Sequence, residues 1–133
     1  MIPDCEDIAR YILENYTKKV VEIGVGSRPE VALALKGELD VVVTDMHEQE
    51  YAGVRFCRDD VFEPDTGIYR NATLLYSIRP PIDLQAAMAK IARDVGADLL
   101  IRPFGHEKAD LKRFFKKTEL VNYGRARFYL YRS

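Results

Sequence analysis

The sequence predicts an α/β protein with a doubly wound, mostly parallel sheet that ends in an antiparallel hairpin. Short apolar runs alternate with segments of helical period as far as residue 101, and such alternation favours parallel strands joined by right-handed crossovers. Two strand-like segments then flank Gly124 and Arg125, as in a hairpin with a two-residue turn. The length of 133 residues fits one domain, which we expect to span residues 1–133.

The predicted strands are short and rich in β-branched residues. The run from Val41 to Thr44 is apolar without alternation, as in a strand that is buried on both faces. Gly124 comes first in the hairpin turn, which suits a type II′ turn. The parallel strands are expected at residues 20–23, 40–45, 54–57, 72–78 and 97–101, and the hairpin strands at 119–123 and 126–131.

Four helices are expected from apolar residues at helical spacing. Asp4, Ser27 and Asp83 are candidate N-caps of the first three helices. Ser27 is followed three residues later by Glu30, which is the spacing of a capping box. The fourth helix is expected near residues 107–117, where its apolar side chains would face the core and its lysines the solvent.

Composition narrows the class of protein. Hydrophobic residues make up 47% and charged residues 31% of the chain, which is typical of a folded globular protein. We find no apolar run long enough to span a bilayer and no signal-peptide pattern in the acidic N-terminus, so we expect a cytoplasmic protein. Two cysteines and two histidines predict no metal site and no disulfide framework.

Charge is unevenly distributed along the chain. Residues 1–50 contain 5 Lys or Arg against 11 Asp or Glu, whereas residues 101–133 contain 9 against 3. The basic C-terminal part could face an anionic small molecule or RNA. It could equally be the solvated face of a helix followed by a basic hairpin.

Ligands of open α/β sheets bind beyond the carboxyl ends of the strands. The first predicted strand ends in Glu22-Ile23-Gly24-Val25-Gly26, where two glycines allow a tight turn and close approach of a ligand. Pro29 replaces the third glycine of a dinucleotide fingerprint, and Glu30 would repel a pyrophosphate. Glu22, Gly24, Val25 and Gly26 therefore favour a zwitterionic nucleoside over NAD, the alternative being an ordinary tight turn.

Acidic residues follow the second and third strands. Asp45 lies 19 residues beyond Gly26, a distance at which a carboxylate can accept hydrogen bonds from ribose hydroxyls. Asp60 could accept from an exocyclic amine, and the backbone amide of Val61 could donate to a ring nitrogen. The alternative is that these acidic residues only form turns.

These motifs together resemble the class I S-adenosylmethionine-dependent methyltransferases, which have a Rossmann-like fold, over nearly the whole chain. The resemblance implies that Glu22 and the Gly24–Gly26 loop lie against the methionine part, that Asp45 binds ribose and that Asp60 with Val61 binds adenine. Arg28 stands where that family usually has a third glycine. The segment that begins at Ser77, which we group with the cofactor-binding residues, and the small size also resemble the small archaeal uncharacterised protein family 0146.

The ends of the fourth and fifth strands repeat the tripeptide Ile-Arg-Pro, at Ile78-Arg79-Pro80 and Ile101-Arg102-Pro103. Each proline biases the arginine before it to an extended conformation. We therefore expect Arg79, Pro80 and Arg102, with the nearby His106, to bind an anionic substrate, because guanidinium groups suit carboxylate or phosphate. Alternatively, both arginines pair with local carboxylates, and His106 is a surface residue.

The sequence therefore predicts an S-adenosylmethionine-dependent methyltransferase that acts on a small anionic molecule or RNA. The acceptor is not assigned, and neither is any catalytic residue. Two alternatives remain open. One is a non-catalytic protein that binds S-adenosylmethionine or a nucleotide, and the other is a subunit whose acceptor site is completed by a partner.

Overall fold

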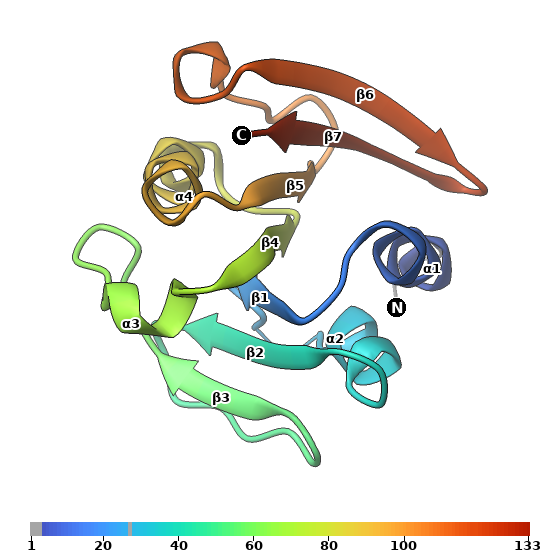
Figure 1. Cartoon of the computed structure of the whole chain (residues 1–133), viewed down its shortest axis with the longest axis vertical. Helices are drawn as coiled ribbons and strands as arrows, with labels where there is room; N and C mark the ends of the chain where they lie inside the picture. Colours follow the sequence, from blue (N-terminus) through green and yellow to red (C-terminus); the bar gives the residue numbers. More distant parts are fainter. Residues whose placement is uncertain (1–3, 27) are drawn as a thin grey trace.

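The computed structural model describes residues 4–26 and 28–133 and contains a seven-stranded sheet (Figure 1). The strand order is β3-β2-β1-β4-β5-β7-β6, and the strands from β1 to β5 are parallel. β7 is antiparallel to both of its neighbours, β5 and β6. The predicted fold class is confirmed. The strands are β1 (Lys19–Ile23), β2 (Asp40–Asp45), β3 (Arg55–Arg58), β4 (Ala72–Ile78), β5 (Asp98–Arg102), β6 (Lys117–Tyr123) and β7 (Ala126–Arg132).

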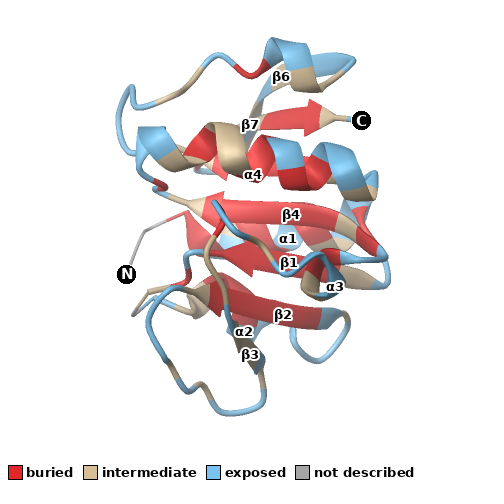
Figure 2. Cartoon of the chain, turned by 90° about the vertical axis from the view of Figure 1, so that its left-hand side faces the viewer, coloured by how far each residue is buried: buried red, intermediate tan, exposed pale blue. Residues whose placement is uncertain are grey.

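Helices cover both faces of the sheet, with α1 and α2 on one face and α3 and α4 on the other (Figure 1). Each face has its own hydrophobic core. Successive residues such as Val20 and Val21 point into opposite cores, which explains why the parallel strands inside the sheet are mostly apolar, unlike the edge strand β3 (Figure 2). The helices are α1 (Cys5–Asn15), α2 (Glu30–Leu35), α3 (Thr66–Tyr69) and α4 (Ile82–Val95), with a 3₁₀ turn, η1 (Lys112–Phe114).

The helix predicted near residues 107–117 is wrong, because the structure has only the short η1 there. The buried side chain of Gln85, on α4, binds the backbone of this segment instead. Its amide donates to the carbonyl of Glu107 at 2.8 Å and its oxygen accepts from Ala109 N at 2.9 Å. These bonds satisfy backbone groups that a helix would satisfy internally, so an irregular segment is stable here.

The predicted helix caps are also corrected. Asp4 occupies the N-cap position of α1, as predicted, but its side chain makes no capping bond. Asp83 is not a cap, because α4 begins at Ile82 and its N-cap is Pro81. Glu30 is the first residue of α2 rather than the third of a capping box, while Ser27 lies outside the described residues. The sequence reading missed α3, which Asp65 caps by accepting a hydrogen bond from Gly67 N.

The closing hairpin turns as predicted and is anchored to α1. Gly124 has a φ of +59°, as the first central residue of a type II′ turn requires. Asp7 of α1 accepts a hydrogen bond from Arg125 N at 2.9 Å. In the described part of the chain, no helix is long and apolar enough to cross a membrane.

Candidate functional site

The loop between β1 and α2 has the predicted tight turn at the carboxyl edge of the sheet. Gly24 and Gly26 have φ values of +73° and +56°, a conformation that glycine adopts without steric cost. A Cβ atom at either glycine would meet no atom within 4 Å. The amides of Gly24 and Val25 both donate to the carbonyl of Thr44, at 2.9 and 3.0 Å. These hydrogen bonds fix the loop to β2, and the side on which a Cβ atom of either glycine would project is open.

A cavity of about 270 Å³ lies over this loop. The residues that line it include one acidic residue, Glu22, and two arginines, Arg28 and Arg79. Arg28, which stands where the methyltransferase family usually has a third glycine, therefore adds a cationic residue to the cavity lining. The remaining lining residues are Gly24, Val25, Gly26 and Ile78.

Glu22 is the most perturbed carboxyl group of the site. It is 1% exposed, and its Oε1 has no hydrogen-bond partner in the described part of the chain. Burial raises the pKa of Glu22 to about 8, and the charge of Glu30 adds to the rise. The Tyr76 hydroxyl lies beside Glu22 and partly offsets the rise in pKa, although the geometry is not that of a hydrogen bond. A buried, unpaired carboxyl on a cavity wall suits a cationic ligand.

Asp45 ends β2, as predicted, and holds the glycine loop in place. Its Oδ2 accepts a hydrogen bond from Gly26 N at 2.7 Å, and its Oδ1 accepts one from His47 N at 3.1 Å. An ionised carboxylate can accept about four hydrogen bonds. Both oxygens of Asp45 therefore retain capacity for further donors beside the loop.

Asp60 follows β3 at a hollow of about 350 Å³, which Met46 and Arg58 also help to line. Val61, the next residue, does not line this hollow but a separate one against α4. Asp60 Oδ1 accepts a hydrogen bond from Phe62 N at 2.9 Å. The side chain of Val61 is 9% exposed and belongs to the core under α4. Val61 can therefore offer a ligand its backbone but little of its side chain.

Ser77 does not line the cavity over the glycine loop. It is 1% exposed, and its hydroxyl donates to the carbonyl of Ile23 at 2.7 Å. The Ser77 side chain therefore ties β4 to β1, and its placement gives no support to the prediction that it binds a cofactor.

The predicted anion site shared by Arg79 and Arg102 is wrong. Arg102 Nε donates to Asp4 Oδ2 at 2.9 Å, and Asp4 is 4% exposed, so this arginine is occupied by a buried carboxylate. Arg79 has a φ of +54° instead of the expected extended conformation, and its guanidinium lies 5.3 Å from the centroid of the Phe104 ring. The two residues belong to the linings of different cavities. Pro80, the third member of this predicted set, is buried, and its carbonyl accepts from Gln85.

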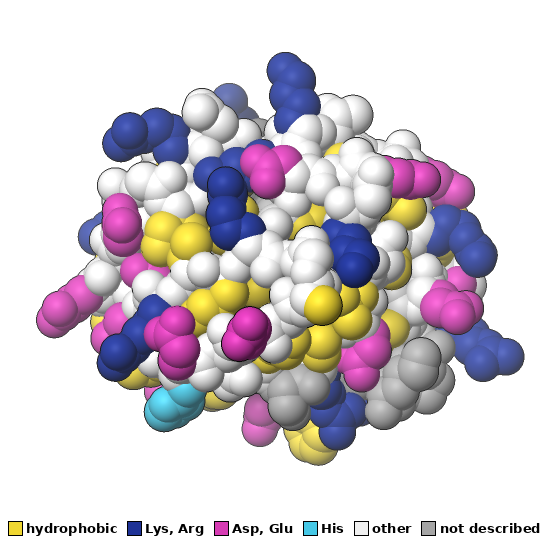
Figure 3. Space-filling view, turned by 90° about the horizontal axis from the view of Figure 1, so that it is seen from below, with side chains coloured by type: hydrophobic (Ala, Val, Ile, Leu, Met, Phe, Trp, Pro, Cys, Tyr) yellow, Lys and Arg dark blue, Asp and Glu magenta, His cyan; other side chains and the backbone are white. Residues whose placement is uncertain are grey.

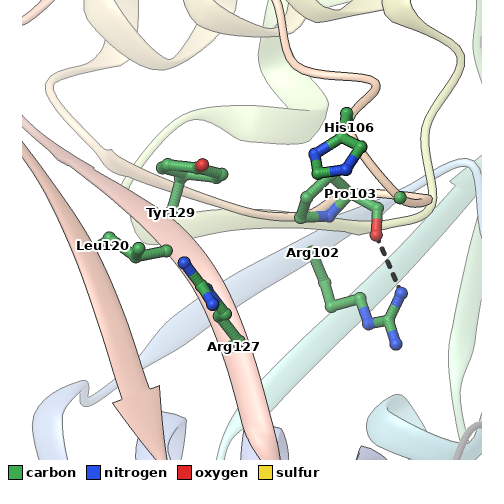
Figure 4. A pocket seen from close by; sticks show the side chains of 7 residues that line it. Arg102, Pro103, His106, Leu120, Arg127 and Tyr129 are labelled. Carbon is green, nitrogen blue, oxygen red and sulfur yellow. Dashed lines mark hydrogen bonds between the residues drawn. The ribbon is translucent and has the colours of Figure 1, made fainter.

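His106 is exposed and lies in the loop after β5, beside Arg102 rather than beside the glycine loop (Figure 4). The structure thus brings Glu22, Arg79 and the Gly24–Gly26 loop together but leaves His106 apart from them. Among residues 4–26 and 28–133, no group of three His, Cys, Asp or Glu side chains is placed to hold a metal ion.

The sequence reading missed a set of exposed apolar side chains at the carboxyl edge of the sheet. Six large apolar side chains are exposed among the described residues, and four of them follow the ends of β2 to β5: Met46, Phe62, Ile82 and Phe104. Figure 3 views the molecule from the side of β3 and shows apolar surface between acidic and basic side chains on that side. Exposed apolar side chains grouped at the carboxyl edge are typical of a binding surface. Its sequence signal is a large apolar residue within a few positions of each strand end.

The strand order, the antiparallel β7 and the glycine loop after β1 define a Rossmann-like fold of the class I methyltransferase type. Solved structures of that type agree over nearly the whole chain. The N-terminal domain of EvdMO1 with SAH bound has a TM-score of 0.71 at 13% identity, covering 98% of this chain and 82% of that one. Magnesium protoporphyrin IX methyltransferase from Synechocystis with bound SAM has a TM-score of 0.62 at 14% identity, covering 97% and 78%. At such identities the likeness concerns the fold.

Residues 5–133 match the uncharacterised protein family UPF0146, and the chain belongs to that family. The UPF0146 protein of Archaeoglobus fulgidus is 44% identical over 128 residues, covering 94% of this chain and 92% of that protein. The UPF0146 protein of Methanocaldococcus jannaschii is 35% identical over 130 residues, covering 94% and 91%. The resemblance to this archaeal family is therefore confirmed.

Proposed function

We propose that this protein is a minimal S-adenosylmethionine-dependent methyltransferase that acts on a small anionic molecule or RNA. The observation that carries the proposal is the buried carboxyl of Glu22, whose Oε1 has no hydrogen-bond partner among the described residues, on a cavity over an open glycine loop. Solved structures of the same fold, described as holding SAH or SAM, add support.

The charges on the cavity wall complement an amino-acid zwitterion. Glu22 offers a carboxyl group to an ammonium group, and Arg28 and Arg79 offer guanidinium groups to a carboxylate. In this assignment Asp45 accepts from the ribose hydroxyls with its remaining lone pairs. Asp60 at the hollow beside Met46, with the backbone of the next residue, Val61, binds adenine.

The fit is poorer for a dinucleotide. A pyrophosphate would sit at the start of the helix after β1, where Glu30 is the first residue of α2. The carboxylate of Glu30 would repel a phosphate at this position.

When bound, S-adenosylmethionine supplies an electrophilic methyl group, so the protein's task is chiefly to align two reactants. Asp45 keeps the glycine loop in its turn through Gly26 N. Glu22 and the loop orient the amino-acid end. Such a role needs no acid–base triad, and none of the site residues described above forms one.

A second candidate function is a subunit that is completed by a partner or that binds the cofactor without catalysis. The exposed apolar side chains at the carboxyl edge favour it, because Phe62 and Phe104 are 59% and 56% exposed next to the site. A partner that covers this edge would bury them.

Ligand binding to the full chain tests the proposal, because a ligand of the folded state raises stability by about 2.7 kcal/mol at 100 times its Kd. We expect SAH to raise the melting temperature and NAD to leave it unchanged. Glu22→Gln should weaken SAH binding, and Glu38→Gln, an exposed carboxyl remote from the cavity lining, serves as the matched control. A shift with NAD and none with SAH would overturn the proposal. Consumption of S-adenosylmethionine with anionic acceptors separates the enzyme from a binding protein.

A further inference from the structure

A second cavity, of about 340 Å³, lies between the loop after β5 and the β6–β7 hairpin (Figure 4). We call it the hairpin pocket. The loop contributes Pro103 and His106, and the hairpin contributes Leu120, Arg127 and Tyr129. A volume of this size is in the range of small-molecule sites.

The hairpin pocket is cationic. Its lining contains no Asp or Glu. Arg127 makes no ion pair with any described residue, and neither does His106, in contrast to Arg102, which Asp4 neutralises. Lys108 adds a further positive charge next to the lining, because its Nζ lies 4.8 Å from the centroid of the Tyr129 ring. The net charge of +6 over residues 101–133 is thus concentrated partly on this pocket.

The hairpin pocket also has an apolar wall. Leu120 is paired with Tyr129 across the two strands, and Asn122 is paired with Arg127 two positions further along. Residues at this spacing share one face of a sheet, so the guanidinium of Arg127 stands beside the Leu120 and Tyr129 side chains. Leu120 is 39% exposed although it is a large apolar residue. The pocket therefore combines apolar surface with cationic groups.

We propose that the hairpin pocket binds a small organic phosphate whose body is a planar ring. The ring would pack on Leu120 and Tyr129, and the phosphate would accept hydrogen bonds from Arg127 and His106. These two donors come from separate segments on different sides of the pocket (Figure 4). Such an arrangement suits the tetrahedral oxygens of a phosphate better than a planar carboxylate.

The hairpin pocket adjoins the cavity over the glycine loop. Ile78 and Arg102, the last residues of β4 and β5, are paired, and Arg79 N donates to the carbonyl of Arg102. Arg79 lines the glycine-loop cavity and Arg102 lines the hairpin pocket. The idea that this organic phosphate is the methyl acceptor rests on the proposed function. Binding of the phosphate to the hairpin pocket does not depend on it.

Titration calorimetry of the full chain with phenyl phosphate, inorganic phosphate, benzoate and phenol tests this site without any cofactor. We expect phenyl phosphate to bind at least fivefold more tightly than inorganic phosphate, because its ring buries apolar surface. Benzoate should bind more weakly than phenyl phosphate, and phenol should not bind. Arg127→Gln should weaken phenyl phosphate binding about tenfold. Arg125→Gln, which removes the same charge from the turn of the same hairpin but not from the pocket lining, should leave binding nearly unchanged.

Equal losses in Arg127→Gln and Arg125→Gln would show a general charge effect and overturn the proposal. So would binding of benzoate as tight as that of phenyl phosphate, or no binding of phenyl phosphate. The melting temperature of each variant checks that it folds. SAH binding, measured separately, tests the proposed function. A protein that binds SAH but not phenyl phosphate would overturn only the hairpin-pocket proposal, and the reverse result would overturn only the proposed function.

Discussion

Replacing Glu22 with glutamine should make the protein more stable at alkaline pH. The pKa of Glu22 is raised from 4.5 to about 8 in the folded protein because the group is buried. Between these two values the folded state holds a proton that the unfolded state releases. The free energy of unfolding therefore falls as pH rises through this window. The stabilising contribution is fully present below pH 4.5 and is lost above about pH 8.

The magnitude follows from the size of the shift. Each pH unit within the window costs about 1.4 kcal/mol, so the whole window corresponds to about 5 kcal/mol as an upper limit. Glutamine has nearly the shape of the protonated carboxyl and does not titrate. Glu22→Gln should therefore match the parent protein near pH 5 and exceed its stability increasingly towards pH 9.

Urea denaturation followed by circular dichroism at a series of pH values measures this difference directly. Glu38→Gln is the control, because it makes the same change at an exposed position. A difference between Glu22→Gln and the parent protein that stays constant from pH 5 to pH 9 would refute the reasoning. Affinity for a ligand with an ammonium group should follow the opposite pH trend to stability, since ionised Glu22 binds such a ligand better than protonated Glu22. The affinity for SAH should therefore rise with pH up to about 8 in the parent protein and stay flat in the variant.

Two further predictions concern the loop and the hairpin. Asp45→Ala removes the 2.7 Å hydrogen bond to the glycine loop. It should lower SAH affinity at least tenfold in a calorimetric titration, since a charge-assisted hydrogen bond contributes about 1.5–3 kcal/mol. Asp40, which is exposed at the other end of β2, supplies the control, because Asp40→Ala should leave SAH affinity unchanged. Gly124→Ala should destabilise the protein by about 1–2 kcal/mol, because Gly124 has a φ of +59° and its new Cβ would lie 2.6 Å from Asp7. Gly37→Ala, with no atom within 4 Å and no positive φ, should be neutral or slightly stabilising by thermal denaturation, and equal effects at both glycines would contradict this explanation.

The strands were predictable because their environment is simple. The parallel strands other than the edge strand β3 are covered on both faces, so their runs are mostly apolar and end where polar or turn residues begin. The helix expected at 107–117 failed for a different reason. Its helical spacing of apolar residues is real, but Gln85, more than 20 residues earlier, supplies the hydrogen bonds that hold the segment irregular. A contact of that range leaves no local pattern in the sequence.

The two arginines show the same limit at the candidate site. Arg102 follows Ile101, whose side chain lies in the core under α4. Alternation along the strand therefore turns the Arg102 side chain to the α1 face, where it pairs with Asp4. Alternation was visible in the sequence, but the partner 98 residues away was not. Arg79 adopts a left-handed conformation that its proline disfavours. In contrast, the glycine loop and Asp45 lie as expected, because strand-end geometry determines them.

The small size of the protein bears on what it can bind. The connection between β2 and β3 contains no helix, and the connection between β5 and β6 contains only η1. Neither connection supplies an α-helix to cover the carboxyl edge, and Phe104 is 56% exposed there. Two cavities of about 270 and 340 Å³ are nevertheless formed by strand ends, the loops after β1 and β5, and the hairpin. An acceptor that fits within the hairpin pocket needs no lid from this chain. A larger acceptor, such as RNA, would extend over the exposed apolar side chains of the carboxyl edge. Burial of these side chains on binding would therefore distinguish a large acceptor from a small one.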